Sequence, residues 1–114
     1  MTCEERLESI LKGFQKNRTA FTAIGDDTRL LILYVLLESN LAGIRVGEIA
    51  KKTHLTRPSV SHHLQILKEA GIIAMRKEGT KNYYYLSANE TKWKDIKDLV
   101  NTIYESIQSI GSHS

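Results

Sequence analysis

The chain has 114 residues, of which 41% are hydrophobic and 25% are charged, and its formal net charge is +3. This length fits one domain, residues 1–114, and the composition excludes a disordered tail. The mild positive charge is compatible with phosphate-bearing partners but does not require them.

Cysteine content and hydropathy exclude two further classes of protein. Cys3 is the only cysteine, so a secreted scaffold held by intrachain disulfides is excluded. Residues 1–18 are charged and lack the apolar core of a signal peptide. The longest apolar run, residues 30–37, is far shorter than the roughly 20 residues that a membrane-spanning helix needs. We therefore expect a cytoplasmic protein without a membrane partner.

The N-terminal segment is predicted to form one helix over about residues 1–24. Thr2 and Glu5 have the spacing of a capping box, in which two side chains satisfy free backbone N–H groups at a helix start. Apolar residues then recur at helical spacing as far as Gly25, at Leu7, Ile10, Leu11, Phe14, Phe21 and Ile24.

A second helix is predicted from Asp26 or Asp27 to about Ser39. A carboxylate suits a helix N-terminus because it caps free N–H groups and interacts favourably with the helix dipole. Residues 30–37 are apolar, with Tyr34, on every side of this helix. Because such a helix has no polar face for water, we expect it to be the buried centre of the domain.

A helix-turn-helix is predicted over residues 46–70. After a turn at about residues 40–43, a short helix is expected at 46–53 and a second one at 57–70. Gly71 is expected to end the second helix in the left-handed conformation.

The periodicity then changes to that of a hairpin over residues 72–86. Strands are expected at 72–77 and 82–86 because both segments are rich in β-forming side chains. A last helix is expected over 88–110, after a second capping box that begins at Ser87. The fold class is mainly α with a small β-hairpin: a winged helix-turn-helix in the order helix, helix, helix, helix, strand, strand, helix.

The second helix of the helix-turn-helix carries the candidate DNA contacts. Val60, Leu64 and Leu67 form one stripe that should dock on the domain, so the polar residues between them point outward. Such a helix fits the major groove, and basic residues of the hairpin would meet phosphates or the adjacent minor groove. The predicted DNA-binding residues are Arg57, Ser59, Ser61, His62, Gln65, Arg76, Lys77 and Lys81.

Three segments resemble the signature of the ArsR-type winged-helix repressors. They are Asp27-Thr28-Arg29-Leu30-Leu31-Ile32-Leu33, Val46-Gly47-Glu48-Ile49-Ala50, and Ser59-Val60-Ser61-His62-His63-Leu64-Gln65-Ile66-Leu67-Lys68-Glu69-Ala70-Gly71. The resemblance covers about residues 20–86, and its most specific part is the Ser-His-His-Leu core. It implies a symmetric dimer that blocks a promoter until an inducer releases it. The recognition positions that it implies, Arg57, Ser59, Ser61 and His62, agree with the helix geometry.

Many relatives in that family sense metal ions, but neither common type of site is present. In the site at the start of the third helix, Arg45 and Gly47 stand where the family has cysteines, and neither side chain can ligate a metal. In the site on the last helix, residues 88–110 contain no histidine, and carboxylates alone favour hard ions over zinc or nickel. We therefore expect no metal and no cofactor.

The remaining histidines and the cysteine leave one alternative open. His63 is expected to be a packed, hydrogen-bonded residue and His54 an exposed turn residue. Cys3 and His113 lie near opposite chain ends, and a metal- or redox-responsive site using both across a dimer is an alternative to an inert terminal thiol.

The last helix carries an apolar seam with spacings of 3, 4, 3, 4 and 3 residues. Such a heptad pattern favours a second helix alongside, so we expect a homodimer formed by the segments 1–24 and 88–110. A twofold dimer would present two recognition helices to a near-palindromic operator. The predicted interface residues are Leu7, Phe14, Trp93, Ile96, Val100, Ile103, Ile107 and Ile110.

The function predicted from the sequence is therefore sequence-specific regulation of transcription, as a repressor released by an effector. The missing metal ligands leave three alternatives for its regulation: a small organic inducer held between helices, a redox signal at Cys3, or no effector at all. A protein-interaction module without DNA binding is a second hypothesis, because fold alone does not fix function. An enzyme is disfavoured, because no phosphate loop, catalytic carboxylate pair or activated nucleophile emerges from the pattern.

Overall fold

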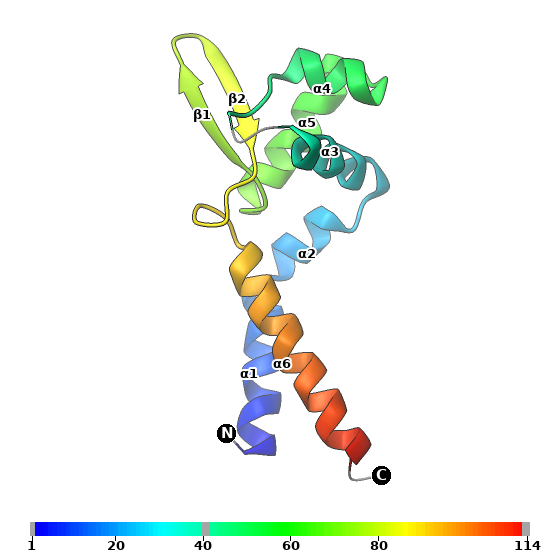
Figure 1. Cartoon of the computed structure of the whole chain (residues 1–114), viewed down its shortest axis with the longest axis vertical. Coiled ribbons are helices and arrows are strands. Elements are labelled where there is room, and N and C mark those ends of the chain that lie inside the picture. Colours follow the sequence, from blue (N-terminus) through cyan, green and yellow to red (C-terminus); the bar gives the residue numbers. More distant parts are fainter. Residues whose placement is uncertain (1, 40–41, 113–114) are drawn as a thin grey trace.

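The computed structural model describes residues 2–39 and 42–112, and it divides into a compact body and a narrower stalk (Figure 1). The molecule measures 55 × 26 × 22 Å along its principal axes. The body contains α2 to β2, and the stalk is formed by α1 and α6. In chain order the elements are α1 (Cys3–Lys16), α2 (Arg18–Ile24), α3 (Asp27–Glu38), α4 (Val46–Thr53), α5 (Arg57–Glu69), β1 (Ala74–Glu78), β2 (Lys81–Tyr85) and α6 (Trp93–Ser112).

The predicted first helix is in fact two helices, because the chain turns at Asn17. Thr2 caps α1 as expected, since its hydroxyl accepts a hydrogen bond from the Glu5 N–H at 3.1 Å. Asn17 is buried and its side-chain amide donates to the carbonyl of Gly13 at 2.9 Å. An asparagine side chain competes with the backbone for such carbonyls and so ends a helix. The break sends α1 into the stalk and leaves α2 in the body.

Helix α3 begins where the sequence predicted, but only one side of it is buried. An oxygen of Asp26 accepts from the Arg29 N–H at 3.0 Å, and this bond holds the pKa of Asp26 below its ordinary value. Ile32, Leu33, Val35 and Leu36 lie in the core, whereas the other apolar side chains of this helix, Leu30, Leu31, Tyr34 and Leu37, are 43–70% exposed. The expectation of a helix buried on all sides is wrong, because α4 and α5 cover one face only.

The helix-turn-helix and the hairpin follow the prediction closely. His54 ends α4 with a left-handed φ of 59°, and Gly71 follows α5 with a φ of 77°. The two antiparallel strands pair from Ala74 with Tyr85 to Glu78 with Lys81. They are displaced from the predicted ranges, because Ile72 and Ile73 belong to the core instead of the ladder.

A short bridge joins the hairpin to the segment before α4. Ile44 and Tyr84 exchange two backbone hydrogen bonds, of 3.0 and 2.9 Å. The hairpin is therefore fixed to the start of the helix-turn-helix as well as to its end.

The start of α6 differs from the prediction. The Ser87 hydroxyl accepts from the N–H groups of Asn89 and Glu90, but this cap serves a turn at residues 88–90. The helix itself begins at Trp93, whose indole N–H donates to the carbonyl of Ile72 at 3.0 Å. The first turns of α6 are thereby attached to the body, and Ile96 is buried in the core.

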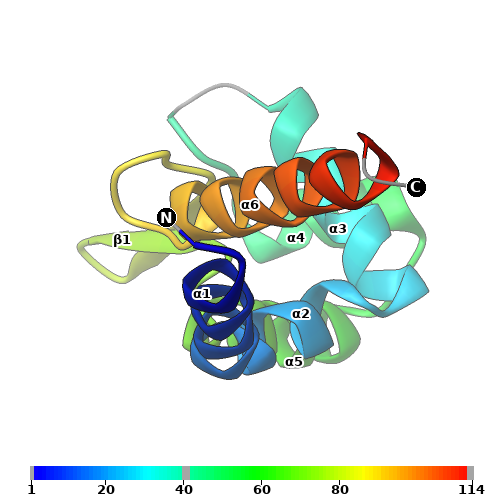
Figure 2. The ribbon, with the colours of Figure 1, turned by 90° about the horizontal axis from the view of Figure 1, so that it is seen from below.

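The two helices of the stalk, α1 and α6, lie next to each other when viewed from below (Figure 2) and are in close contact at Gly13. A Cβ atom on Gly13 would lie 2.6 Å from a methyl carbon of Leu99, so α1 and α6 approach closely there. Lys16 and Asp95 form an exposed ion pair of 3.3 Å beside this contact. Within residues 2–39 and 42–112, no helix combines the length and the apolar character that crossing a membrane requires.

We predict that Asp26→Ala lowers the melting temperature at pH 7 and that this difference shrinks in acid. Because the folded-state pKa is lowered, the cap stabilises the fold above the ordinary pKa of 3.8, and its contribution is lost as the pH falls through the lowered value. Thermal unfolding at pH 7 and at a pH below the lowered pKa of Asp26 measures both effects. Asp26→Asn is the control, since an amide caps without titrating. An Asp26→Ala defect that does not change with pH would contradict the assignment.

Candidate nucleic-acid interface

Helix α5 has one buried and one exposed face, with the orientation that the sequence predicted. The hydroxyl of Thr56 accepts from the Ser59 N–H at 3.2 Å and so fixes the start of the helix. The stripe formed by Val60, Leu64 and Leu67 is fully buried, at 0% exposure for each residue. On the other side, Arg57, Ser61, His62 and Gln65 are exposed, and Ser59 is half-buried. A row of short polar groups therefore runs along the outside of α5.

A polar groove of about 520 Å³ lies beside the start of this helix. It is bounded by the first turns of α4 and α5 and by the hairpin tip, through Arg45, Val46, Gly47, Glu48, Lys51, Arg57, Ser61, Thr80 and Asn82. Three of these side chains are cationic and one is anionic, which makes the groove suitable for a phosphate-bearing chain. Its location between helix and hairpin brings residues from two predicted DNA-binding elements together.

Of the residues that line this groove, only Arg57 and Ser61 were predicted from the sequence. The polar and charged residues that sequence reasoning missed are Arg45, Glu48, Lys51, Thr80 and Asn82. Arg45 was considered only as a position where a metal-binding cysteine is missing, although it precedes α4 and forms no side-chain cap. Lys51 has no special spacing that distinguishes it from an ordinary exposed lysine. Thr80 and Asn82 flank Lys81, so the basic hairpin tip was the available signal for them.

The guanidinium of Arg57 packs against α4 at Gly47. A Cβ atom built on Gly47 would lie 2.9 Å from Nη2 and 3.2 Å from Cζ of Arg57. Because these distances are shorter than ordinary contacts, any larger residue at position 47 would displace the guanidinium. The absence of a side chain at Gly47 thus leaves room for the guanidinium of Arg57 at this position in the groove.

Of the three basic residues predicted on the hairpin, two are exposed to solvent and the third is bonded to neighbouring hairpin side chains. Lys77 and Lys81 are exposed near the tip. Arg76 is half-buried; its Nε bonds to Glu78 at 3.0 Å, and its guanidinium lies 4.9 Å from the centre of the Tyr83 ring. Arg76 therefore packs along one face of the hairpin. To contact a phosphate as predicted, its guanidinium would have to leave Glu78 and the Tyr83 ring.

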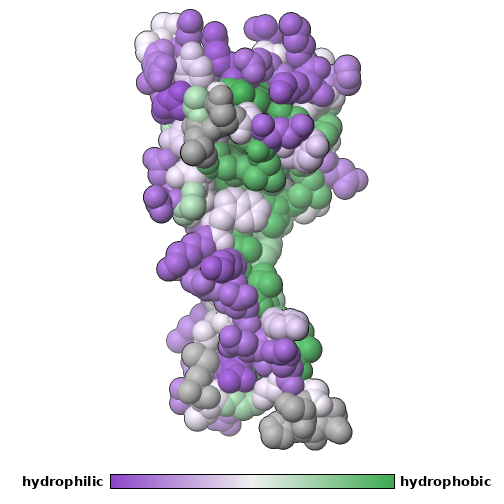
Figure 3. Space-filling view, viewed as in Figure 1, coloured by the Kyte–Doolittle hydropathy of each residue, from purple (hydrophilic) through white to green (hydrophobic). Residues whose placement is uncertain are grey.

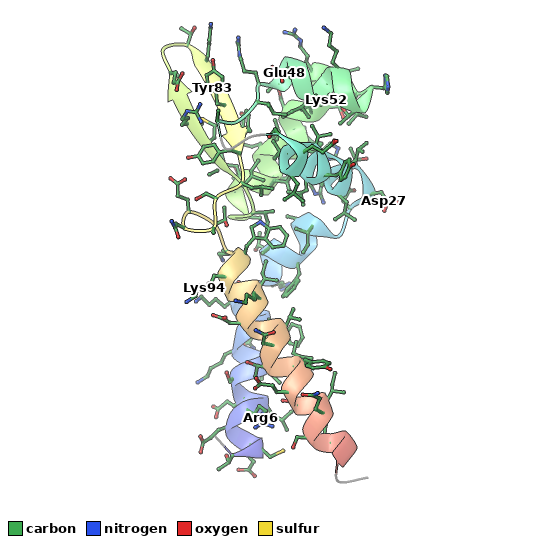
Figure 4. The ribbon with its side chains drawn as sticks, viewed as in Figure 1. Arg6, Asp27, Glu48, Lys52, Tyr83 and Lys94 are labelled. Atoms are coloured by element: carbon green, nitrogen blue, oxygen red, sulfur yellow. The ribbon has the colours of Figure 1, made fainter. Side chains whose placement is uncertain are left out.

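The same end of the molecule is hydrophilic over a wide area (Figure 3). Figure 4 shows Glu48 and Lys52 of α4 and Tyr83 of β2 there, far from the stalk. Near Tyr83, the Tyr85 hydroxyl donates to Glu90 at 2.8 Å, and this bond raises the pKa of Tyr85. The groove connects the start of α5 to the hairpin tip, because its lining includes Arg57 and Ser61 of α5 as well as Thr80 and Asn82. We refer to the exposed face of α5, the groove and the hairpin tip together as the polar surface.

His63 is bonded on the inner side of α5, as the sequence led us to expect. Its Nδ1 lies 3.3 Å from Nη1 of Arg29, so it accepts from the guanidinium and carries its proton on Nε2 when neutral. The Nε of Arg29 donates to the carbonyl of Ala23. Arg29 therefore links α5 to the end of α2. The His63 ring also contacts the exposed His62 ring edge to face, with ring centroids 5.5 Å apart.

No group of three or more His, Cys, Asp or Glu side chains that could hold a metal occurs in the part of the chain that the structure describes. Cys3 is exposed at the tip of the stalk. His113 lies outside the described residues, so the alternative site with Cys3 and His113 stays a hypothesis.

Comparison with known proteins identifies the family. The sequence profile of the arsR family of bacterial regulatory proteins matches residues 26–74. The chain is 42% identical over 93 residues to an uncharacterized HTH-type transcriptional regulator of Methanocaldococcus jannaschii, covering 82% of this chain and 100% of that protein. It is 34% identical over 92 residues to the arsenical resistance operon repressor of Escherichia coli, covering 79% and 77%.

The chain belongs to the arsR family. The arsR-family fold is also found in the homodimeric winged helix-turn-helix DNA-binding domain of a possible ArsR-family regulator from Mycobacterium bovis. That structure has a TM-score of 0.57 and 25% identity, covering 96% of this chain and 91% of that one. The resemblance inferred from the sequence and the winged helix-turn-helix fold class are confirmed.

For this arsR-family protein we predict that Gly47→Ala weakens DNA binding about tenfold through Arg57. The added methyl group displaces a guanidinium whose contact with a base is expected to contribute about 1–3 kcal/mol. The measurement is a double-mutant cycle of DNA affinity with Gly47→Ala, Arg57→Ala and the double variant. Additive losses in the double variant would show that Gly47 acts independently of Arg57. The melting temperature serves as the control, since alanine favours a helix over glycine.

Proposed function

We propose that this arsR-family protein is a homodimeric transcriptional repressor that binds a near-palindromic operator in double-stranded DNA. The observation that carries the proposal is the polar surface at one end of the body, where the exposed face of α5 adjoins a basic groove and a basic hairpin tip. A regulator of this kind works where the promoter is, so we place it in the cytoplasm.

Each part of the polar surface is assigned a different contact. Ser61, His62 and Gln65 have short polar groups that reach base edges when α5 lies in the major groove. Gln65 also donates to Glu69 at 2.7 Å, which orients its amide. Arg57 is assigned to a guanine, with Ser59 at the helix start near a phosphate.

Cations around α5 are assigned to the DNA backbone. Lys77 and Lys81 of the hairpin would contact phosphates or the adjacent minor groove. Arg45 and Lys51, on the opposite side of the groove, would contact phosphates of the strand that enters it. Phosphate contacts of this type give affinity that falls with salt, whereas contacts to bases give selectivity.

The dimer is assigned to the stalk, with an interface smaller than the sequence predicted. Val100, Ile107 and Ile110 of α6 are 51–65% exposed, and Leu7 and Phe14 of α1 are 56% and 46% exposed. Ile103 is half-buried between them. Ile96 has little surface to offer because it is 7% exposed in its own core. Trp93 donates its indole N–H to the body, but it is only half-buried and keeps some surface for a partner. A twofold dimer through the stalk would set the two α5 helices about 34 Å apart, on successive major grooves.

The proposed type of effector follows from the side chains at the positions where metal-sensing relatives have ligands. Arg45 and Gly47 in place of cysteines favour a small organic inducer over a metal ion, and a redox signal at Cys3 is the second candidate. A winged-helix module that binds only proteins is the competing function. It is distinguished by DNA affinity, because a protein-binding module would show none that depends on salt and sequence.

We predict tight, selective binding of the metal-free protein to its own upstream promoter. Arg57→Ala and His62→Ala should each weaken binding to that promoter by about 10- to 100-fold while binding to scrambled DNA changes little, since a good base contact is worth about 1–3 kcal/mol. Fluorescence anisotropy at two salt concentrations measures both affinities.

Lys81→Ala is the matched control for these variants. It should weaken binding to both DNAs equally and reduce the dependence on salt, because a phosphate contact carries no sequence information. Equal and weak binding of the unmodified protein to both DNAs would favour the protein-binding module.

We further predict that Ile107→Asp raises the dimer dissociation constant about tenfold or more. The substitution buries a charge in an apolar interface, yet the side chain is 61% exposed in the single chain, so the protomer keeps its fold. Sedimentation equilibrium measures the constant. Asn101→Asp adds the same charge to an exposed polar position of α6 and should leave it unchanged. A dimer that tolerates Ile107→Asp would exclude α6 from the interface.

A further inference from the structure

Exposed apolar side chains are confined to three helices. Every large apolar residue that is exposed among the described residues belongs to α1, α3 or α6, and none belongs to α2, α4, α5 or the hairpin. They are Leu7, Leu11 and Phe14 of α1, Leu30, Leu31, Tyr34 and Leu37 of α3, and Val100, Tyr104, Ile107 and Ile110 of α6. A soluble protein rarely exposes so much contiguous apolar surface without a partner.

The surface on α3 forms the wall of a pocket. Leu30, Tyr34 and Leu37 follow the helical spacing of one face, and with Trp93 and Leu86 they line a cavity of about 470 Å³. Its lining is almost wholly apolar. In Figure 3 the hydrophobic surface of the body continues down one edge of the stalk.

Trp93 connects this pocket to the stalk. Trp93, Val100 and Ile107 are spaced by seven residues, so they lie along one side of α6. The pocket on α3 is therefore the upper end of the α6 stripe that the proposed dimer uses.

The spacing of the α6 stripe is compatible with an antiparallel partner. Its intervals of 3, 4, 3, 4 and 3 residues are the same from either end, so a twofold axis perpendicular to the helix would pair residue 93 with 110 and residue 100 with 103. At about 1.5 Å per residue, Trp93 and Ile110 are about 26 Å apart along the helix. The tip of one stalk then lies at the base of the other, beside α3.

The C-terminal end of α6 is uncharged, which suits an apolar pocket. Residues 106–112 have the sequence Ser-Ile-Gln-Ser-Ile-Gly-Ser and contain no charge. The tip of α1 is different, because Glu4, Glu5, Arg6 and Glu8 are all charged. Insertion of the α6 tip into an apolar pocket buries no charge, whereas insertion of α1 would bury several.

We propose that the pocket on α3 receives the C-terminal end of α6 from a second copy of the chain. Ile107 of the partner subunit and Ile110 of the partner subunit would then cover Leu30, Tyr34 and Leu37. This inference rests on the proposed stalk dimer and adds to it a contact with the body. The other face of α3 packs on α4 and α5, so the contact lies directly behind the DNA-binding helices.

Disulfide trapping tests the contact. In a Cys3→Ser background, Leu37→Cys protein mixed with Ile110→Cys protein should form a disulfide-linked dimer under mild oxidation. Leu37 is 70% exposed and Ile110 is 65% exposed, so neither substitution disturbs the fold of the chain. Non-reducing electrophoresis detects the product.

Leu31→Cys is the matched control for Leu37→Cys. Leu31 is on the same helix and is 43% exposed, but it does not line the pocket. The mixture with Leu31→Cys should therefore give at least about tenfold less linked dimer. Equal yields from both mixtures would overturn the proposal, as would a disulfide within one chain when Leu37→Cys and Ile110→Cys are combined.

Sedimentation and DNA binding separate this proposal from the proposed function. A dimer that binds the promoter but does not cross-link would overturn the α3 contact alone and leave the pocket open for a small apolar ligand. A monomer would overturn the stalk dimer and the α3 contact together, and its promoter binding would then be measured independently.

Discussion

A helix that is apolar on every side needs neighbours on every side, and α3 has neighbours on only one. Its inner face, with Ile32, Val35 and Leu36, organises α4, α5 and the hairpin into one body. Its outer face, with Leu30, Tyr34 and Leu37, has no covering element within the described chain. The inner face of α3 is therefore covered on the side that supports the DNA-binding elements. Its outer face is uncovered, and this is the face that we propose a second chain covers.

As a result, the polar surface and the exposed apolar surfaces lie in different parts of the molecule. The polar end, with α5, the groove and the hairpin tip, has no large exposed apolar side chain. The apolar end has the long stripe of α6 and the pocket on α3. Arg29 lies between them, since it bonds both His63 of α5 and the end of α2. Arg29 of α3 therefore joins α3 directly to α5 by a side-chain hydrogen bond.

Local signals predicted most of the fold, because caps and turns depend on nearby residues. Thr2 and Asp26 cap the helices that they were expected to cap, and Gly71 ends α5 in the left-handed conformation. The helix-turn-helix and the hairpin follow from such signals and from the change in hydrophobic period. The outward orientation of Ser61, His62 and Gln65 also followed from periodicity alone.

What the sequence did not predict depends on contacts between distant segments. The break at Asn17 is favourable because α1 can then pack on α6 at Gly13. The later start of α6 reflects two bonds from Lys92 and Trp93 to residues 71 and 72. The contact of Arg57 with Gly47 likewise joins two helices, and no spacing along the chain indicates it.

The position of Trp93 has a spectroscopic consequence. It is the only tryptophan in the chain, it lines the pocket on α3, and its indole N–H is bonded to the body while part of its ring remains exposed. Indole emission depends on the water around the ring. The protein therefore contains its own optical reporter for whatever enters that pocket, without any added label.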